Sequence, residues 1–195
     1  DVSITLPENY YLATPGEMAY HEEEFKNITK RDEKTRKVNR WGTRQTPAPA
    51  SSRNMKTLRY TVTQSNGFTW AADKRYNLFL DTIITEGSDD ILLEIFFTDQ
   101  DAAYWTNTPE KVKAIVSYYT SKLGSYPFKK LSVVQTPWHT RQSSHIGMVQ
   151  VGSVMNEFEL ELALARQIGN IWFQHIVNPD AVSQPWMSAS LSAAY

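Results

Sequence analysis

The feature that most constrains the fold of this chain is a long apolar periodicity within residues 157–195. Apolar side chains recur there at steps of mostly three or four residues, at Leu160, Leu164, Ile168, Ile171, Trp172 and Ile176. This spacing predicts a helix that buries one broad face. Phe158, Leu162 and Phe173 widen that face, so we expect the helix to lie centrally in the fold.

A polar break follows this helix, and a second helical pattern runs to the end of the chain. Trp172-Phe173 in the first helix and Trp186-Met187 at the entry of the second resemble the W-F and W-[LM] pairs of one family, and they align without a gap. The family is the gluzincin metallopeptidases of the aminopeptidase-N type, the membrane alanyl aminopeptidase family. Its members carry H-E-x-x-H on the first helix and a glutamate ligand on the second.

The resemblance assigns the two histidine ligands of the family to Arg166 and Asn170, its glutamate ligand to Ala189 and its general base to Gln167. A hydrolytic zinc needs three protein ligands with lone pairs to donate. A guanidinium has no lone pair to offer, and glutamine cannot take a proton from water. The chain is therefore predicted to be a degenerate member of the family that has lost the zinc motif, and no cofactor is expected.

Three shorter segments resemble the same family in the same order, at residues 1–11, 68–73 (F-T-W-A-A-D) and 124–134 (G-S-Y-P-F-K-K-L-S-V-V). The resemblance implies an α+β fold, with the end of an N-terminal β-sandwich followed by the α/β part of a thermolysin-like domain around a central helix. The implied domains are residues 1–86, the C-terminal part of the sandwich with a charged loop at 21–52, and residues 87–195, a partial peptidase domain.

Local patterns predict the elements in more detail. Alternating residues predict strands at 1–6, 58–63 and 68–73, and Asn66-Gly67 supplies the turn of a hairpin between the last two. Apolar runs predict strands at 78–84 and 91–97. Thr108 is the predicted N-cap of a helix that has Pro109 at its first position and ends at Gly124.

The segment from His21 to Ser52 is dense in charge. The basic stretch from Lys26 to Arg44 suggests an interaction module for polyanions as one hypothesis. Interspersed acidic residues and a tail rich in proline and serine favour a mobile, solvated loop instead.

The family holds the amino terminus of its substrate with a glutamate that corresponds here to Ser144 or His145. Neither residue carries a dependable negative charge, so amino-terminal capture is in doubt. With Trp172, these two residues are the candidates for lining a substrate cleft.

No replacement metal site is predicted. The four histidines are His21, His139, His145 and His175, and none is followed four residues later by a second ligand. Absence of cysteine excludes disulfides and thiolate zinc sites. The net charge of −1 gives no global attraction to nucleic acid, and no apolar run is long enough to span a bilayer.

The leading hypothesis is a catalytically inactive, aminopeptidase-like fragment that serves as a scaffold or binds a peptide or protein. The alternative is an active zinc aminopeptidase whose metal site is completed by unrecognised residues or by the rest of a longer protein. The opening on a strand and the end inside a helix suggest that the sequence is an excerpt from such a longer protein. The family implies an extracytoplasmic location, and the sequence does not give the oligomeric state.

Overall fold

The structure, a computed structural model, describes residues 1–39, 41, 47–63, 67–85, 89–137 and 142–173. Four helices lie in this part: α1 (Glu22–Arg36), α2 (Ala102–Trp105), α3 (Thr108–Leu123) and α4 (Glu157–Trp172). The strands are β1 (Val2–Pro7), β2 (Tyr11–Ala13), β3 (Glu17–Met18), β4 (Met55–Thr61), β5 (Ala71–Asp73), β6 (Asn77–Ile83), β7 (Ile91–Phe97), β8 (Lys130–Gln135), β9 (Ser143–His145) and β10 (Met148–Val151). The fold is mixed helix and sheet, as predicted.

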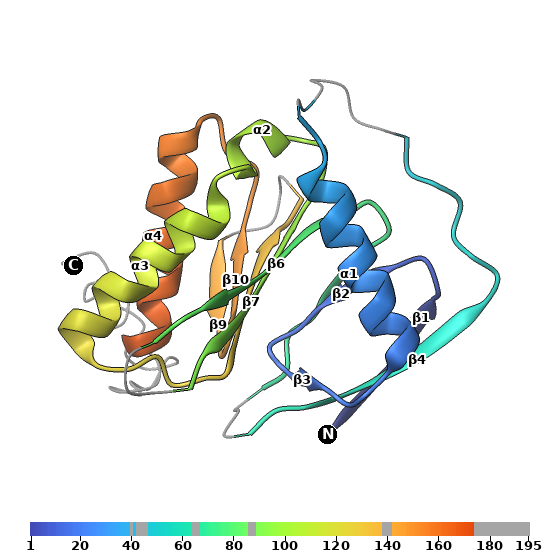
Figure 1. Cartoon of the computed structure of the whole chain (residues 1–195), viewed down its shortest axis with the longest axis horizontal. Coiled ribbons are helices and arrows are strands. Elements are labelled where there is room, and N and C mark those ends of the chain that lie inside the picture. Colours follow the sequence, from blue (N-terminus) through green and yellow to red (C-terminus); the bar gives the residue numbers. More distant parts are fainter. Residues whose placement is uncertain (40, 42–46, 64–66, 86–88, 138–141, 174–195) are drawn as a thin grey trace.

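A five-stranded sheet in the order β6-β7-β8-β10-β9 organises the molecule. Its middle strands β7, β8 and β10 run parallel, while β6 and β9 are antiparallel edge strands. Helices α3 and α4 cover one face of this sheet, and α1 lies on the other (Figure 1). Because β6 and β7 pair along their whole length, the sheet continues across the predicted domain boundary between residues 86 and 87.

The large core lies between this sheet and helices α3 and α4. The predicted apolar face of α4 is confirmed over the described residues, because Leu160, Leu164, Ile168, Ile171 and Trp172 are fully buried; Ile176 lies outside the described residues. The proposed widening of that face is wrong at Phe158 and Leu162, which are 73% and 49% exposed. Each lies six residues before a core position, which is about 600°, or roughly 120° away around the helix.

Helix α3 begins and ends nearly as predicted. Its N-cap is Asn107 rather than Thr108, whose side chain is buried, and Pro109 lies in the first turn. Gly124 follows the last helical residue with a φ of 95°, a value that side-chain-bearing residues rarely adopt. The predicted strands at 78–84 and 91–97 are confirmed as β6 and β7.

The charged segment is the main correction to the predicted elements, because residues 22–36 form helix α1 instead of a loop. The side chain of His21 caps the helix by accepting a hydrogen bond from the backbone N–H of Glu24. Ion pairs one turn apart join Lys26 to Glu22 and Arg36 to Asp32. The interspersed acids therefore support a helix that the low apolar content concealed.

The predicted hairpin between residues 58–63 and 68–73 is also wrong. Strand β4 pairs with β1 and β3 in a three-stranded sheet, whereas β5 pairs with β2. The turn predicted at Asn66-Gly67 lies partly outside the described residues. Across the described ranges, no helix combines the length and apolar character needed to cross a membrane.

Candidate functional site

Helix α4 is fixed at its start by its own side chains. The carboxamide of Asn156 accepts a hydrogen bond from the backbone N–H of Glu159, and the Glu159 carboxylate accepts one from the N–H of Met155, each 2.9 Å long. The first bond satisfies one of the N–H groups that the start of a helix leaves without partners, and the second fixes the residue before the N-cap. The helix then packs against β10 and β9, the last two strands of the sheet, and against α3.

The predicted zinc-motif residues lie near the middle and end of α4. Arg166 is exposed, Gln167 is buried, and Asn170 is half-buried. Arg166 and Asn170 are four residues apart and share one face of the helix, as the ligand positions of the resembling family require. Asn170 Oδ1 is buried and receives no hydrogen bond from any residue that the structure describes.

These side chains are poorly suited to hold a metal. Arginine offers no lone pair, and the amide oxygens of asparagine and glutamine are weak zinc ligands. Within the described ranges, no group of three His, Cys, Asp or Glu residues could hold a metal ion. Ala189, His139 and His175 lie outside these ranges, so the predictions made for them stay predictions.

Ser144 and His145 lie on β9, at the edge of the sheet. Ser144 pairs with Val149 of β10 and is buried, whereas the His145 ring is exposed enough to reach solvent. Partial burial of this ring lowers its pKa below the ordinary value of 6.5. Since α4 contacts β9, the fold brings this strand beside the helix that carries Arg166 and Asn170.

Trp172 is fully buried, so it has no surface to offer a ligand. Its indole N–H donates a hydrogen bond of 2.9 Å to the Gly124 carbonyl. Its ring contacts those of Tyr119 and Tyr126, with centroids 5.5 and 5.2 Å away. This residue joins α4 to the end of α3 and is part of the core.

Sequence reasoning missed Gly169, which lies between the two ligand positions. A Cβ atom there would lie 2.5 Å from the Tyr119 hydroxyl and 2.6 Å from the ring carbon that bears it. The glycine therefore allows α3 and α4 to approach closely. A glycine inside a helix lowers helix stability by about 1 kcal/mol relative to alanine. Its presence within the apolar helical pattern was therefore the signal that could have indicated a close helix contact.

Comparison with known proteins finds no family model and no curated protein that matches the sequence. Solved structures do match. The M1 zinc metallopeptidase from Deinococcus radiodurans has a TM-score of 0.57 at 12% identity, covering 88% of this chain and 33% of its own. Aminopeptidase A of Legionella pneumophila, solved with aspartic acid, has a TM-score of 0.58 at 8% identity, covering 87% of this chain and 19% of its own.

A third match is a two-domain M1 zinc metallopeptidase variant bound to L-arginine, with a TM-score of 0.55 at 13% identity. It is covered over 33% of its length, so this chain spans at most about a third of these three structures. Identities this low establish likeness of fold and nothing finer. The described part of the chain therefore has the fold of a segment of the M1 zinc metallopeptidases.

Proposed function

We propose that this chain is a non-catalytic, aminopeptidase-like module that binds an extended peptide or protein segment along β9, beside α4. The observation that carries the proposal is the set of side chains at the positions where the resembling family holds zinc and activates water. Arg166 is exposed and can hydrogen-bond to a ligand, but Arg166, Gln167 and Asn170 can neither ligate a hydrolytic zinc well nor deprotonate water.

The edge of the five-stranded sheet supports this binding mode. Strand β9 is the last strand of the sheet, and β10 is its pairing partner within the described residues. An extended segment can add to such an edge through main-chain hydrogen bonds. Because α4 contacts β9, a segment added to this edge would also lie beside the helix, and the polar side chains of β9 could hydrogen-bond to it.

The charge of this region suggests which peptides fit. Arg166 is exposed and forms no ion pair with any residue described here. A guanidinium binds carboxylates in a bidentate geometry and is the natural partner for an acidic side chain or a free carboxyl terminus. We therefore expect acidic peptides to bind more tightly than basic ones.

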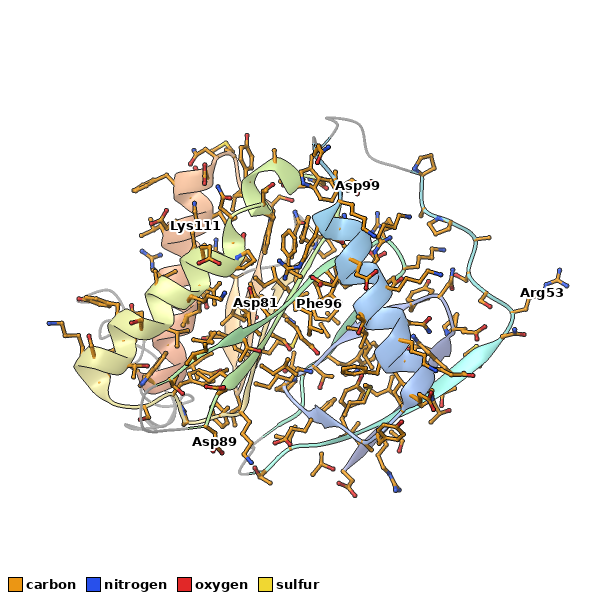
Figure 2. The ribbon with its side chains drawn as sticks, viewed as in Figure 1. Arg53, Asp81, Asp89, Phe96, Asp99 and Lys111 are labelled. Atoms are coloured by element: carbon orange, nitrogen blue, oxygen red, sulfur yellow. The ribbon has the colours of Figure 1, made fainter. Side chains whose placement is uncertain are left out.

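The test is titration of the ¹⁵N-labelled full chain with an acetylated valine–threonine pentapeptide that ends in glutamate. Amide signals of residues 143–150 are expected to shift. Arg166→Glu should weaken binding about fivefold or more, because it replaces attraction by repulsion. Arg53→Glu is the matched control, since Arg53 is also exposed but lies on the far side of the molecule from α4 (Figure 2).

Equal binding by both charge-reversal variants, or no shift along β9, would contradict the proposal. The alternative function, an active zinc aminopeptidase, is tested with the same peptide lacking its acetyl group. Release of the amino-terminal residue that a chelator abolishes would favour that enzyme. The fold of the M1 neighbours is the observation that keeps this alternative in view.

A further inference from the structure

A cavity of about 620 Å³ lies on the opposite face of the five-stranded sheet, between the start of α1 and strands β6 and β7. Its walls are mostly apolar and include Met18, Phe25, Ile28, Leu80 and Leu92. A volume of this size is typical of sites for small organic molecules. The cavity is separated by the sheet from α4, so it is distinct from the site proposed above.

The strand register explains why the cavity opens here. Alternate residues of β7 face α1, and among them Phe96 (Figure 2) belongs to the same buried apolar cluster as Ile28. Two residues earlier, Glu94 lies between Leu80 of β6 and Ser132 of β8. At the next step Leu92 is 40% exposed, because α1 no longer covers the sheet.

A buried ion pair forms the floor of the cavity. Lys130 Nζ lies 2.9 Å from Glu94 Oε2, and both residues are at most 6% exposed. Lys130 Nζ also donates to the Gly16 carbonyl at 3.2 Å, and Ser132 Oγ lies 3.4 Å from Glu94 Oε2. These contacts tether the segment before β3 to the sheet, which is a structural role.

The same contacts leave one hydrogen-bonding group on each partner. Two of the three N–H groups of Lys130 are used, and the Tyr60 ring, 5.9 Å from Nζ, is not a conventional acceptor. Glu94 Oε1 receives no hydrogen bond from the described residues, since both contacts are made to Oε2. One donor of Lys130 and one carboxylate oxygen of Glu94 thus have no protein partner among the described residues, and both residues line the cavity.

We propose that this cavity binds a small, uncharged molecule with an apolar body and a carboxamide head. The carbonyl oxygen of the amide accepts from Lys130 Nζ, and its N–H group donates to Glu94 Oε1. The apolar body lies against Phe25, Ile28 and Leu92. An amide head supplies both an acceptor for the remaining N–H of Lys130 and a donor for Glu94 Oε1, whereas a head that supplies either alone leaves one of these two groups hydrogen-bonded to water.

Charge balance argues against a charged head. Glu94 is paired with Lys130, and the lining residues Asp81 and Lys129 are paired with Lys113 and Asp89. A carboxylate head would meet the paired Glu94, and an ammonium head would meet the paired Lys130. Glu17 also lines the cavity and forms no ion pair with a described residue. It is exposed at the mouth, where water screens its charge.

Three probes with the same tail test the head group: 4-phenylbutanamide, 4-phenylbutanoate and 4-phenylbutylamine, each titrated into the ¹⁵N-labelled full chain. The amide is expected to bind with a Kd of roughly millimolar or tighter, the range expected for a molecule of this size. It should bind about tenfold more tightly than either charged analogue. Its shifts should centre on residues 92–94 and 129–132.

Leu92→Asp, which places a charge in the cavity wall, should abolish amide binding. Leu162→Asp is the matched control, since Leu162 is 49% exposed on α4, beyond the sheet, and binding should not change. Three results would overturn the proposal: no binding of the amide, equal or tighter binding of a charged analogue, or binding that survives Leu92→Asp. Retention of the wild-type spectrum elsewhere establishes that the Leu92→Asp variant is folded.

Discussion

The two faces of the five-stranded sheet are covered by different physical means. Helices α3 and α4 lie on one face over a large apolar core. Helix α1 lies on the other over a smaller apolar cluster, and buried charges help to hold it. Lys56 Nζ lies 2.6 Å from Glu24 Oε2, with both side chains at most 8% exposed. Apolar burial defines one face, whereas specific polar contacts define the position of the helix on the other.

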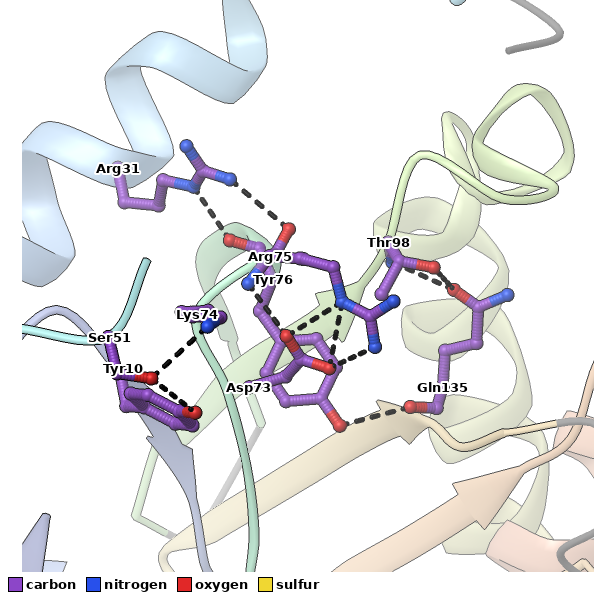
Figure 3. Close-up of polar contacts among 9 residues, drawn as sticks. All are labelled: Tyr10, Arg31, Ser51, Asp73, Lys74, Arg75, Tyr76, Thr98 and Gln135. Atoms are coloured by element: carbon purple, nitrogen blue, oxygen red, sulfur yellow. Dashed lines mark hydrogen bonds and ion pairs between the residues drawn. The ribbon is translucent and has the colours of Figure 1, made fainter. Parts of the chain in front are cut away.

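Arg31 shows how closely α1 depends on such contacts. Its guanidinium donates to the carbonyls of Tyr76 and Arg75, at 2.7 and 3.3 Å (Figure 3). It also lies 5.3 Å from the centre of the Tyr11 ring. Arg36 donates to the Leu80 carbonyl at 2.8 Å. Arg31 and Arg36, which belong to the basic stretch that suggested a polyanion-binding surface, thus bind backbone groups of the protein itself. Mutations should therefore act differently on the two faces.

The largest effect is expected on the apolar face, for Trp172→Ala. The cavity should lower the free energy of unfolding by about 3–5 kcal/mol, and loss of the hydrogen bond to Gly124 by about 1 kcal/mol more. Urea unfolding followed by circular dichroism measures this. Phe158→Ala on the same helix is the control, because an exposed side chain should change stability by about 0.5 kcal/mol or less.

Breaking the buried ion pair tests the other face. Glu24→Gln leaves Lys56 buried without a counter-charge and should cost about 3–5 kcal/mol. Replacing both residues, as Glu24→Leu with Lys56→Met, should cost less than the single change, because no charge is then buried alone. Urea unfolding of the two variants gives the difference. A double variant less stable than the single one would show that the pair itself stabilises α1.

The close approach of α3 and α4 predicts whether Gly169→Ala stabilises or destabilises the protein. Gly169→Ala would stabilise an exposed helix by about 1 kcal/mol. Here we expect it to destabilise the protein by about 1–3 kcal/mol, because the new methyl group would overlap Tyr119. Thermal unfolding distinguishes the two signs, and a raised melting temperature would contradict the described packing of the two helices.

The smallest effect concerns pH and the edge strand. The pKa of His145 is lowered in the folded protein, so the unfolded chain takes up its proton more readily. This contribution to stability is present above about pH 6.5 and is lost as the pH falls below it. His145→Gln should therefore reduce the loss of stability between about pH 7.5 and about pH 5.5. Equal losses in both proteins, measured by urea unfolding, would contradict the assignment.

The comparison of faces also explains what the sequence could predict. The apolar repeats of α3 and α4 and the apolar runs of β6 and β7 were sufficient to predict these four elements, because burial of one face produces a regular spacing. Helix α1 was missed because it is held by charges whose partners, such as Lys56 and the carbonyl of Tyr76, are distant in sequence. The false hairpin failed for a related reason, since β4 and β5 pair with strands near the start of the chain.

The candidate site was predictable in part. Spacing placed Arg166, Gln167 and Asn170 on one helix, and the family resemblance assigned Ser144 and His145, which lie on β9 beside that helix, to the same cleft. The close approach at Gly169 and the cavity above Glu94 depend on helices and strands that meet only in the folded chain. The burial of Trp172 likewise follows from its contacts with α3.

The most direct test of the central claim is the zinc content of the purified protein. Elemental analysis of the native chain, with calorimetric titration of zinc into it, measures both occupancy and affinity. If the ligand positions are those we assign, the protein should contain no stoichiometric zinc and bind none tightly. One tightly held zinc per chain would contradict the account and make a zinc aminopeptidase the leading function.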